Sequence, residues 1–167
     1  MMKIKNLSSE RLNLIPLGLN HLSISYVNWM NDKDVIKHVE SGGNYDMLKL
    51  KNFLTNVESS KILFWAIMLK DKHIGNIKID PVDTKKMTGE YGILIGDKNS
   101  WGKGYAIESS KIVIDYCFND LGIKKIELGV VVSNIKAINL YQKIGFKEYK
   151  RICKNNESVI RMCIKNE

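Results

Sequence analysis

The chain has 167 residues, of which 44% are hydrophobic and 26% are charged, so it can bury a sizeable core and global disorder is excluded. Its formal net charge of +8 favours an anionic ligand, substrate or surface, but the lysines are spread along the chain, which argues against nucleic acid as a partner. No apolar run approaches the roughly 20 residues of a membrane-spanning helix, and the N-terminus lacks the apolar stretch of a signal peptide. We therefore expect a cytoplasmic protein without membrane contact, folded as one domain over residues 1–167.

In the first part of the chain, an alternating segment predicts a strand, and apolar residues at helical spacing then predict three helices around a glycine-rich loop. The period next changes to that of strands, which predicts a hairpin, a polar loop and a further strand. In chain order these segments are a strand at 10–16, two short helices within 20–39, a loop at 41–44, a helix at 46–58, strands at 62–69 and 73–79, a loop at 81–88 and a strand at 89–96.

The second part alternates between helices and strands before it closes with a hairpin. The predicted segments are a helix from Gly104 to about residue 120, a strand at 125–132, a helix at 134–144, and strands at 146–152 and 158–164. The order β, helices, βββ, α, β, α, ββ predicts a mixed α/β sheet that uses both hairpins and crossovers.

Neither cysteine nor histidine spacing indicates a metal site. The three cysteines form no C-x-x-C pair, and we expect buried free thiols: Cys117, Cys153 and Cys163. The three histidines have no ligand spacing, and we expect them at the surface: His21, His38 and His73.

Gly102 and Gly104 stand where the strand at 89–96 leads into a helix. A glycine-rich turn at a helix start presents several backbone N–H groups at the positive end of the helix dipole, which predicts a phosphate-binding site. A dinucleotide-binding fingerprint would need a glycine where Ile107 stands, and no P-loop string occurs. The segment therefore predicts a phosphate-binding turn of another type.

A second pattern follows the strand at 125–132 and consists of Asn134, Ala137, Tyr141 and Gly145-Phe146. Together with the earlier run Trp101-Gly-Lys-Gly-Tyr-Ala106, it resembles the GNAT family of N-acetyltransferases. Within that family it looks most like the branch of ribosomal-protein N-terminal, spermidine and amino-sugar acetyltransferases. The resemblance implies an α/β fold with a mostly antiparallel, twisted sheet of about six or seven strands, splayed at its centre and flanked by about four helices.

The resemblance also implies acetyl-CoA as the acyl donor, with no metal. The family holds the pyrophosphate through backbone amides of the loop that here comprises Trp101, Gly102, Lys103, Gly104, Tyr105 and Ala106. Trp101 replaces the usual Gln or Arg, and Lys103 can add a charge to a phosphate or remain a solvated loop lysine. The family's splayed strand pairs with the pantetheine arm, which here concerns Ile93, Leu94 and Ile95.

Acetyl transfer to an amine needs a proton acceptor for the amine and a proton donor for the departing thiolate. By resemblance, Tyr141 is the general acid and Asn134 contacts the cofactor, although Asn134 is also a plain helix N-cap candidate. Glu90 matches the glutamate base of histone acetyltransferases. In ribosomal-type enzymes the base position corresponds to Gly129, which has no side chain, so Glu127 and a water chain stay open as alternatives. We expect Glu108 to face solvent or to cap its helix locally.

The acceptor itself is not specified by the sequence. We expect its wall to come from residues 25–58 and the 81–88 loop, with these candidates: Trp29, Asn31, Tyr45 and Trp65. The charge argues mildly against polyamines and for an amine that bears phosphate or carboxylate, or for an acidic protein surface. A small-molecule or peptide amine is the expected partner, a homodimer is expected from the family's habit, and transfer to oxygen or a non-catalytic acyl-CoA-binding or nucleic-acid-associated role stays open.

Overall fold

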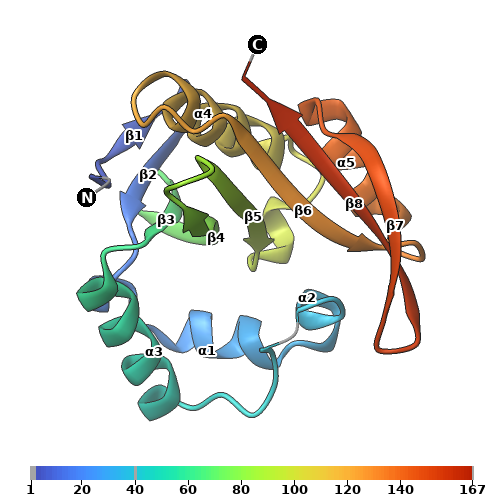
Figure 1. Cartoon of the computed structure of the whole chain (residues 1–167). Coiled ribbons are helices and arrows are strands. Elements are labelled where there is room, and N and C mark those ends of the chain that lie inside the picture. Colours follow the sequence, from blue (N-terminus) through green and yellow to red (C-terminus); the bar gives the residue numbers. More distant parts are fainter. Residues whose placement is uncertain (1–2, 40, 167) are drawn as a thin grey trace.

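The computed structural model describes residues 3–39 and 41–166. Its centre is a sheet of eight strands in the order β1-β2-β3-β4-β5-β6-β8-β7 (Figure 1). Every pair of neighbours is antiparallel except β5 and β6, which are parallel. The strands are β1 (Leu7–Ser8), β2 (Leu12–Pro16), β3 (Leu63–Leu69), β4 (Lys72–Asp83), β5 (Thr88–Ile95), β6 (Lys125–Val131), β7 (Lys147–Lys154) and β8 (Glu157–Lys165).

Five α-helices and two 3₁₀ turns connect these strands within the described residues. The helices are α1 (Ile24–Asn31), α2 (Lys33–Ile36), α3 (Met47–Ser60), α4 (Tyr105–Asn119) and α5 (Ile135–Ile144), and the 3₁₀ turns are Leu19–His21 and Lys98–Ser100. The side chain of Asp32 accepts a hydrogen bond from the Asp34 N–H and caps α2, which is why the predicted helical stretch splits in two there.

The predicted fold class is confirmed, with small differences in the counts and one wrong loop. The strand β1 adds an eighth strand because two residues are too short to leave a period in the sequence. The loop predicted at 81–88 is wrong, since β4 runs on to Asp83 and β5 begins at Thr88. The hairpin continues there past a register shift between Ile79 and Val82, and its exposed polar residues hide the strand period.

Two hydrophobic clusters lie on opposite faces of the sheet. In the larger cluster, buried strand residues on one face of the sheet, such as Ile77 and Ile126, pack against α4 and α5, for example against Val113 of α4. The smaller one joins α1 and α3 to Ala66 of β3, with half-buried Leu94 of β5 beside it. Among the described residues, no side chain of β6, β7 or β8 belongs to this second cluster, so the apolar packing of α1–α3 on the sheet is confined to its β3–β5 half.

The strands β5 and β6 separate along their length. Their ladder joins only Thr88–Glu90 to Lys125–Glu127, while β5 continues to Ile95 and β6 to Val131 (Figure 1). The splay expected from the family resemblance is therefore present. It leaves one edge of β5 without a neighbouring strand beyond Glu90.

The expectation of buried free thiols is correct for Cys117 but wrong for Cys153, which is exposed, and for Cys163, which is half-buried. All three thiols are free.

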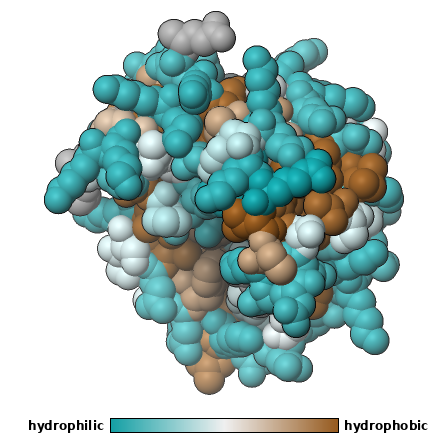
Figure 2. All heavy atoms as spheres, turned by 45° about the vertical axis from the view of Figure 1, so that its right-hand side comes forward, coloured by the Kyte–Doolittle hydropathy of each residue, from teal (hydrophilic) through white to brown (hydrophobic). Residues whose placement is uncertain are grey.

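The expectation of surface histidines is correct for His38 but wrong for His21 and His73. His21 is buried, and its ring lies 5.1 Å from the half-buried ring of His73, which also contacts Trp29 of α1. The sequence did not indicate this burial, because an isolated histidine belongs to no spacing pattern that would show which aromatic side chains it packs against. On the face toward β7, β8 and α5, hydrophilic residues cover most of the surface and hydrophobic patches lie between them (Figure 2).

Candidate active site

The α4 N-terminus has the backbone geometry of an anion site. Gly102 (φ 72°) and Gly104 (φ 83°) adopt the left-handed conformation that glycine tolerates best, and Gly104 is the N-cap residue. The first helical hydrogen bond runs from the Glu108 N–H to the Gly104 carbonyl. The N–H groups of Tyr105 and Ala106 therefore have no partner within the helix and can bind an anion.

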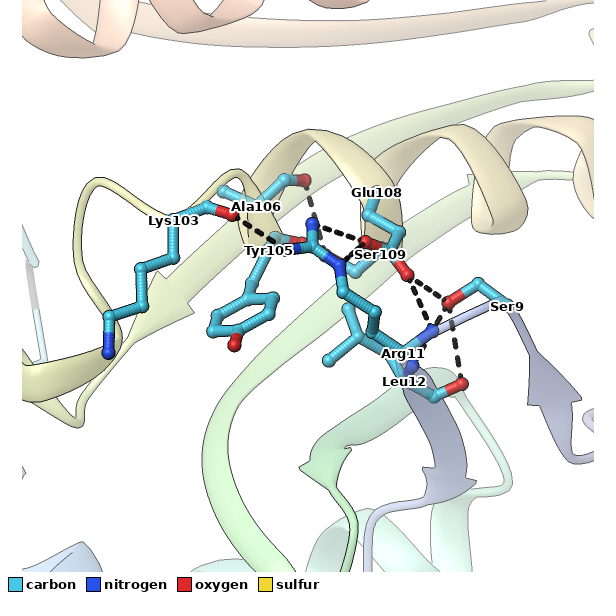
Figure 3. A network of polar contacts seen from close by, with 8 residues as sticks. All are labelled: Ser9, Arg11, Leu12, Lys103, Tyr105, Ala106, Glu108 and Ser109. Carbon is cyan, nitrogen blue, oxygen red and sulfur yellow. Dashed lines mark hydrogen bonds and ion pairs between the residues drawn. The ribbon is translucent and has the colours of Figure 1, made fainter.

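A network of polar contacts fixes this turn to the first hairpin (Figure 3). Glu108 accepts hydrogen bonds from the Ser9 hydroxyl (2.6 Å) and from the backbone N–H (3.0 Å) and Nε (2.7 Å) of Arg11. Arg11 also donates to the carbonyl oxygen of Lys103 (3.1 Å), and its guanidinium lies 4.7 Å from the centre of the Tyr105 ring. The expectation that Glu108 faces solvent or caps locally is wrong, because these partners lie in a distant part of the chain.

The network also sets the charge state of Glu108. Partial burial raises the pKa of its carboxyl, but the hydrogen bonds from Ser9 and Arg11 outweigh this and hold the pKa below its ordinary value. Arg11 was not indicated by the sequence as a site residue. A basic residue beside the predicted first strand gives no signal until the fold brings that strand to the start of α4.

Trp101 connects the glycine turn to the end of β5. Its indole N–H donates to the carbonyl oxygen of Ile95 at 2.8 Å, and 42% of the residue stays exposed. Tryptophan thus replaces the usual polar side chain at this position with a hydrogen bond that holds the loop against the strand. Lys103 is exposed beside it.

The open edge of β5 presents two of the three predicted backbone groups. The Gly96 N–H donates to the Ile74 carbonyl, so in the β4–β5 ladder the even-numbered residues of β5 direct their backbone groups toward β4. By alternation, Ile93 and Ile95 face the splay, which agrees with the Trp101 contact to the Ile95 oxygen. The Leu94 amide faces β4 instead, and its side chain packs toward α1–α3.

Tyr141 of α5 lies against the splayed strand. Its ring centre is 5.7 Å from that of Tyr91 on β5 and 6.1 Å from that of Phe146, both in edge-on contacts. Burial raises the pKa of the Tyr141 hydroxyl, so the group keeps its proton at neutral pH. Within residues 3–39 and 41–166 no hydrogen bond to this hydroxyl occurs, whereas the Tyr91 hydroxyl pairs with Ser110 at 2.7 Å.

Asn134 caps α5, since its side-chain oxygen accepts from the Ala137 N–H at 3.2 Å. This geometry accounts for asparagine at that position through helix capping alone. A contact with the cofactor stays a prediction.

Glu90 lies at the last rung of the β5–β6 ladder and carries a bidentate ion pair. Arg161 of β8 donates to its two oxygens at 2.6 and 2.8 Å, with 22% of the Arg161 side chain and 35% of the Glu90 side chain exposed. The pairing raises the pKa of the Arg161 guanidinium, which stays charged. Both oxygens of the Glu90 carboxylate are therefore occupied by the guanidinium, and a substrate can reach them only when Arg161 moves.

Glu127, the alternative base, is also engaged. It accepts from the Tyr149 hydroxyl at 2.6 Å and pairs with Lys125 at 3.0 Å. Partial burial raises the pKa of its carboxyl, but the hydrogen bonds from Tyr149 and Lys125 outweigh this and lower it. Glu90 and Glu127 face each other in the ladder, so both carboxylates lie at the point where the strands part.

The predicted acceptor wall is only partly at the site. Trp29 packs on the end of β5, where a Cβ at Gly96 would lie 2.1 Å from its ring, and Asn31 clamps the backbone of Tyr45 through two 2.8 Å hydrogen bonds. Trp65 is a wrong candidate, because it is fully buried on the α4 face and donates to the carbonyl oxygen of Lys5. Its place in an apolar strand does not reveal which face it takes.

Lys98 joins the helical part to the cofactor loop. Its ammonium lies 2.8 Å from a carboxylate oxygen of Asp32 and 2.8 Å from one of Asp34, across the junction of α1 and α2. Three residues later the chain enters the Trp101–Ala106 loop. Sequence spacing gives no indication of this link.

Within the part of the chain that the structure describes, no group of three or more His, Cys, Asp or Glu side chains could hold a metal ion. Among the helices of the same residues, none is long and apolar enough to span a membrane.

This part of the fold thus combines a helix start with free backbone amides, a splayed strand and a tyrosine that keeps its proton. A model of the acetyltransferase (GNAT) domain matches residues 11–147, and the chain belongs to this family. An uncharacterized N-acetyltransferase p20 of Bacillus licheniformis is 26% identical over 87% of this chain and 84% of its own length. A spermidine N(1)-acetyltransferase of Vibrio cholerae is 35% identical over 45% of this chain and 43% of its own.

Solved structures show the same fold. A GNAT-family acetyltransferase from Bacillus anthracis superposes with a TM-score of 0.83 at 19% identity, covering 96% of this chain and 98% of its own. The spermidine N-acetyltransferase from Vibrio cholerae in complex with CoA and spermine superposes with a TM-score of 0.83 at 22% identity, covering 94% of this chain and 96% of its own. The family and the fold follow from these matches, and the acceptor of this chain does not.

Proposed function

We propose that this protein transfers the acetyl group of acetyl-CoA to a primary amine, by direct attack while both substrates are bound. The observation that carries this proposal is the continuity of the site. Free amides at Tyr105 and Ala106 lead to the open edge of β5, and that edge leads to half-buried Tyr141, whose ring contacts Tyr91 of β5. Acetyl-CoA supplies the activated thioester and a pyrophosphate that suits the amide turn.

Different segments of the site bind different parts of acetyl-CoA. The N–H groups of the Trp101–Ala106 loop hold the pyrophosphate, with the charge of Lys103 beside them. The outward backbone groups of Ile93 pair with the pantetheine arm in the manner of an added strand. Arg11 and Glu108 keep the loop in place.

The chemistry requires two proton movements. The carbon–nitrogen bond forms as the carbon–sulfur bond breaks, Tyr141 donates its proton to the departing sulfur, and solvent returns one to the phenol. Glu90 receives the proton of the amine once Arg161 has left it, and a water chain is the alternative acceptor. The raised pKa of Tyr141 suits this role, because the hydroxyl must be protonated when the thiolate departs.

The acceptor is a small-molecule or peptide amine. Spermidine acetyltransferases among the relatives favour a small amine, whereas the net charge of +8 disfavours a polycation. We propose a cytoplasmic location for the protein. We also propose that it acts as a single domain, either as a monomer or as a homodimer.

The direct test mixes the protein with acetyl-CoA and a broad panel of amines and alcohols, follows free thiol, and identifies the products by mass. We expect thiol release with at least one amine and an N-acetylated product. Absence of thiol release with every member of the panel would contradict the proposal, and an ester product would move the activity to oxygen.

One observation favours a second candidate, a non-catalytic acyl-CoA-binding module. Glu90 and Glu127 both have cationic partners, so neither carboxylate is free to accept a proton in this structure. The two candidates differ in a single experiment, since a binding module would show CoA affinity by calorimetry without thiol release. Binding to nucleic acid would instead be independent of CoA and fall steeply with salt.

A further inference from the structure

Arg161 reaches across the sheet in an unusual way. It belongs to β8, yet its guanidinium pairs with Glu90 of β5, two strands away, and so passes over β6. Gly129 of β6 makes this crossing possible, since a Cβ at Gly129 would lie 3.2 Å from the Arg161 Nη1. Gly129 stands where the resemblance places the base of ribosomal-type enzymes, and the Arg161 guanidinium occupies the space that a side chain at Gly129 would take.

This cation lies at the mouth of the splay. The register pairs Arg161 with Gly129, two residues beyond Glu127, where β5 and β6 have already stopped pairing. The face is the one that α1–α3 leave uncovered over β6 and β8. An amine that approaches the thioester from the side opposite α4 therefore passes Arg161.

The charges around this point are already balanced. Arg161 neutralises Glu90, and Lys125 together with the Tyr149 hydroxyl satisfies Glu127. A polycationic acceptor would find no unpaired carboxylate in this cluster. Arg161 bonds to both oxygens of Glu90 and also has a side-chain hydrogen bond with Tyr149. A guanidinium has five N–H donors, so Arg161 keeps donors with which it can bind an oxyanion.

We propose that Arg161 binds the carboxylate or phosphate group of an acceptor that carries an anion beside its amine, and that this binding releases Glu90 to receive the amine proton. The inference rests on the proposed acetyl transfer to an amine. The exchange replaces one oxyanion by another on the same guanidinium, so the ion pair is not simply broken. Only an anionic acceptor binds the released state better and can shift the equilibrium toward it.

The experiment measures kcat/KM by thiol release for two matched pairs of acceptors. One pair is an amino acid and its amide, and the other is an amino sugar with and without a phosphate group. Each is measured with the wild type, Arg161→Met, Arg161→Lys and the control Lys150→Met, which removes an exposed cation from the neighbouring strand β7. The intrinsic reactivity of an amine is the same for every variant, so a change in the anionic-to-neutral ratio isolates the guanidinium.

We expect the ratio to fall at least tenfold in Arg161→Met, to fall less in Arg161→Lys, and to stay near the wild-type value in Lys150→Met. Whichever pair responds identifies the anion as carboxylate or phosphate. Glu90→Gln should lower kcat and also lower the KM of the anionic acceptor, because it removes the carboxylate that competes for the guanidinium, whereas Arg161→Met should raise that KM. Calorimetric binding of CoA to each variant confirms that it is folded.

The proposal is overturned if the ratio is the same in wild type and Arg161→Met, or if neutral amines and spermidine are the better substrates of the wild type. Loss of activity by the same factor for both members of a pair would also overturn it, because it would show a structural role only. The underlying activity fails in a different way, namely by the absence of thiol release from the wild type with any amine.

Discussion

The two halves of the site are built from different materials. The proposed cofactor half, residues 91–96 and 101–106 with α5, relies on backbone groups that a glycine turn and an open strand edge expose. The proposed acceptor half relies on side-chain pairs that join distant segments, such as Arg161 with Glu90 and Lys98 with Asp32. A backbone site tolerates changes in most side chains and so suits a cofactor shared by a whole family. A side-chain site changes with single substitutions and so suits an acceptor that differs from one member to the next.

The largest expected effect separates chemistry from binding within the cofactor half. Tyr141→Phe removes the only proton donor that we place at the departing sulfur, so kcat should fall about a hundredfold. The affinity for CoA, measured by calorimetry, should change little because the edge-on ring contacts with Tyr91 and Phe146 remain. The matched control is Tyr91→Phe, which removes a buried hydrogen bond to Ser110 and should lower the melting temperature without a comparable loss of kcat.

If the CoA affinity of Tyr141→Phe fell as steeply as its kcat, Tyr141 would be a cofactor-binding residue. The proposed separation between its role in proton donation and the binding role of the backbone would then be wrong. The same comparison at several pH values adds a check. The raised pKa of Tyr141 predicts no loss of its proton across the neutral range.

The next effect tests whether backbone conformation alone forms the phosphate site. Gly104→Ala places a side chain at φ 83°, which costs about 1–2 kcal/mol in the left-handed region and turns the amides away. We expect the CoA dissociation constant to rise about tenfold. Gly122→Ala introduces the same kind of strain at φ 68° beyond the other end of α4, and should lower stability while leaving CoA affinity unchanged.

Equal losses of CoA affinity in both alanine variants would show that general destabilisation, rather than the amide turn, weakens binding.

The same contrast explains what the sequence could predict. Gly102 and Gly104 indicated the phosphate-binding turn because its backbone conformation demands glycine locally. Hydrophobic periodicity predicted the element order, and the family resemblance predicted the splay. Arg11, Lys98 and Arg161 were not predicted as site residues, although each contacts a site segment. Their partners lie far away in the chain, and no local period or spacing records such a contact. Trp65 failed for a related reason, since alternation shows that a strand has two faces without showing which face meets the acceptor.

A smaller effect concerns the support of the turn by the first hairpin. Arg11→Met removes the ion pair with Glu108 and the hydrogen bond to the Lys103 carbonyl, at a cost of about 1 kcal/mol. The CoA dissociation constant should rise roughly threefold to tenfold. Arg151→Met, which breaks the exposed pair with Glu148 on β7, is the control and should leave CoA binding unchanged. No difference between the two variants would mean that the turn holds its shape without the hairpin.

The last prediction concerns how the helices α1–α3 are attached to the sheet. The Nε2 of His73 lies 3.0 Å from the Gly75 carbonyl and 2.8 Å from Asn76 Oδ1, both acceptors, so the neutral ring carries its proton there. Its Nδ1 is buried and has no partner among the described residues, so a second proton would be left without an acceptor. Burial accordingly lowers the pKa of His73 to about 4, and it also lowers the pKa of neighbouring His21.

A histidine whose pKa is lowered by folding binds its proton more readily in the unfolded chain. Stability is therefore complete above the unfolded pKa of about 6.5 and is lost as the pH falls toward the folded pKa, with a slope of at most about 1.4 kcal/mol per pH unit for one group. The carboxyls with lowered pKa, such as Glu108, contribute their stability above about pH 4.5, so they do not interfere between pH 6.5 and 5. Urea unfolding in that window should show the slope in the wild type, a weaker slope in His73→Met, and the wild-type slope in His38→Gln, which alters an exposed ring. An unchanged slope in His73→Met would show that the contact between α1 and β4 does not depend on a neutral histidine.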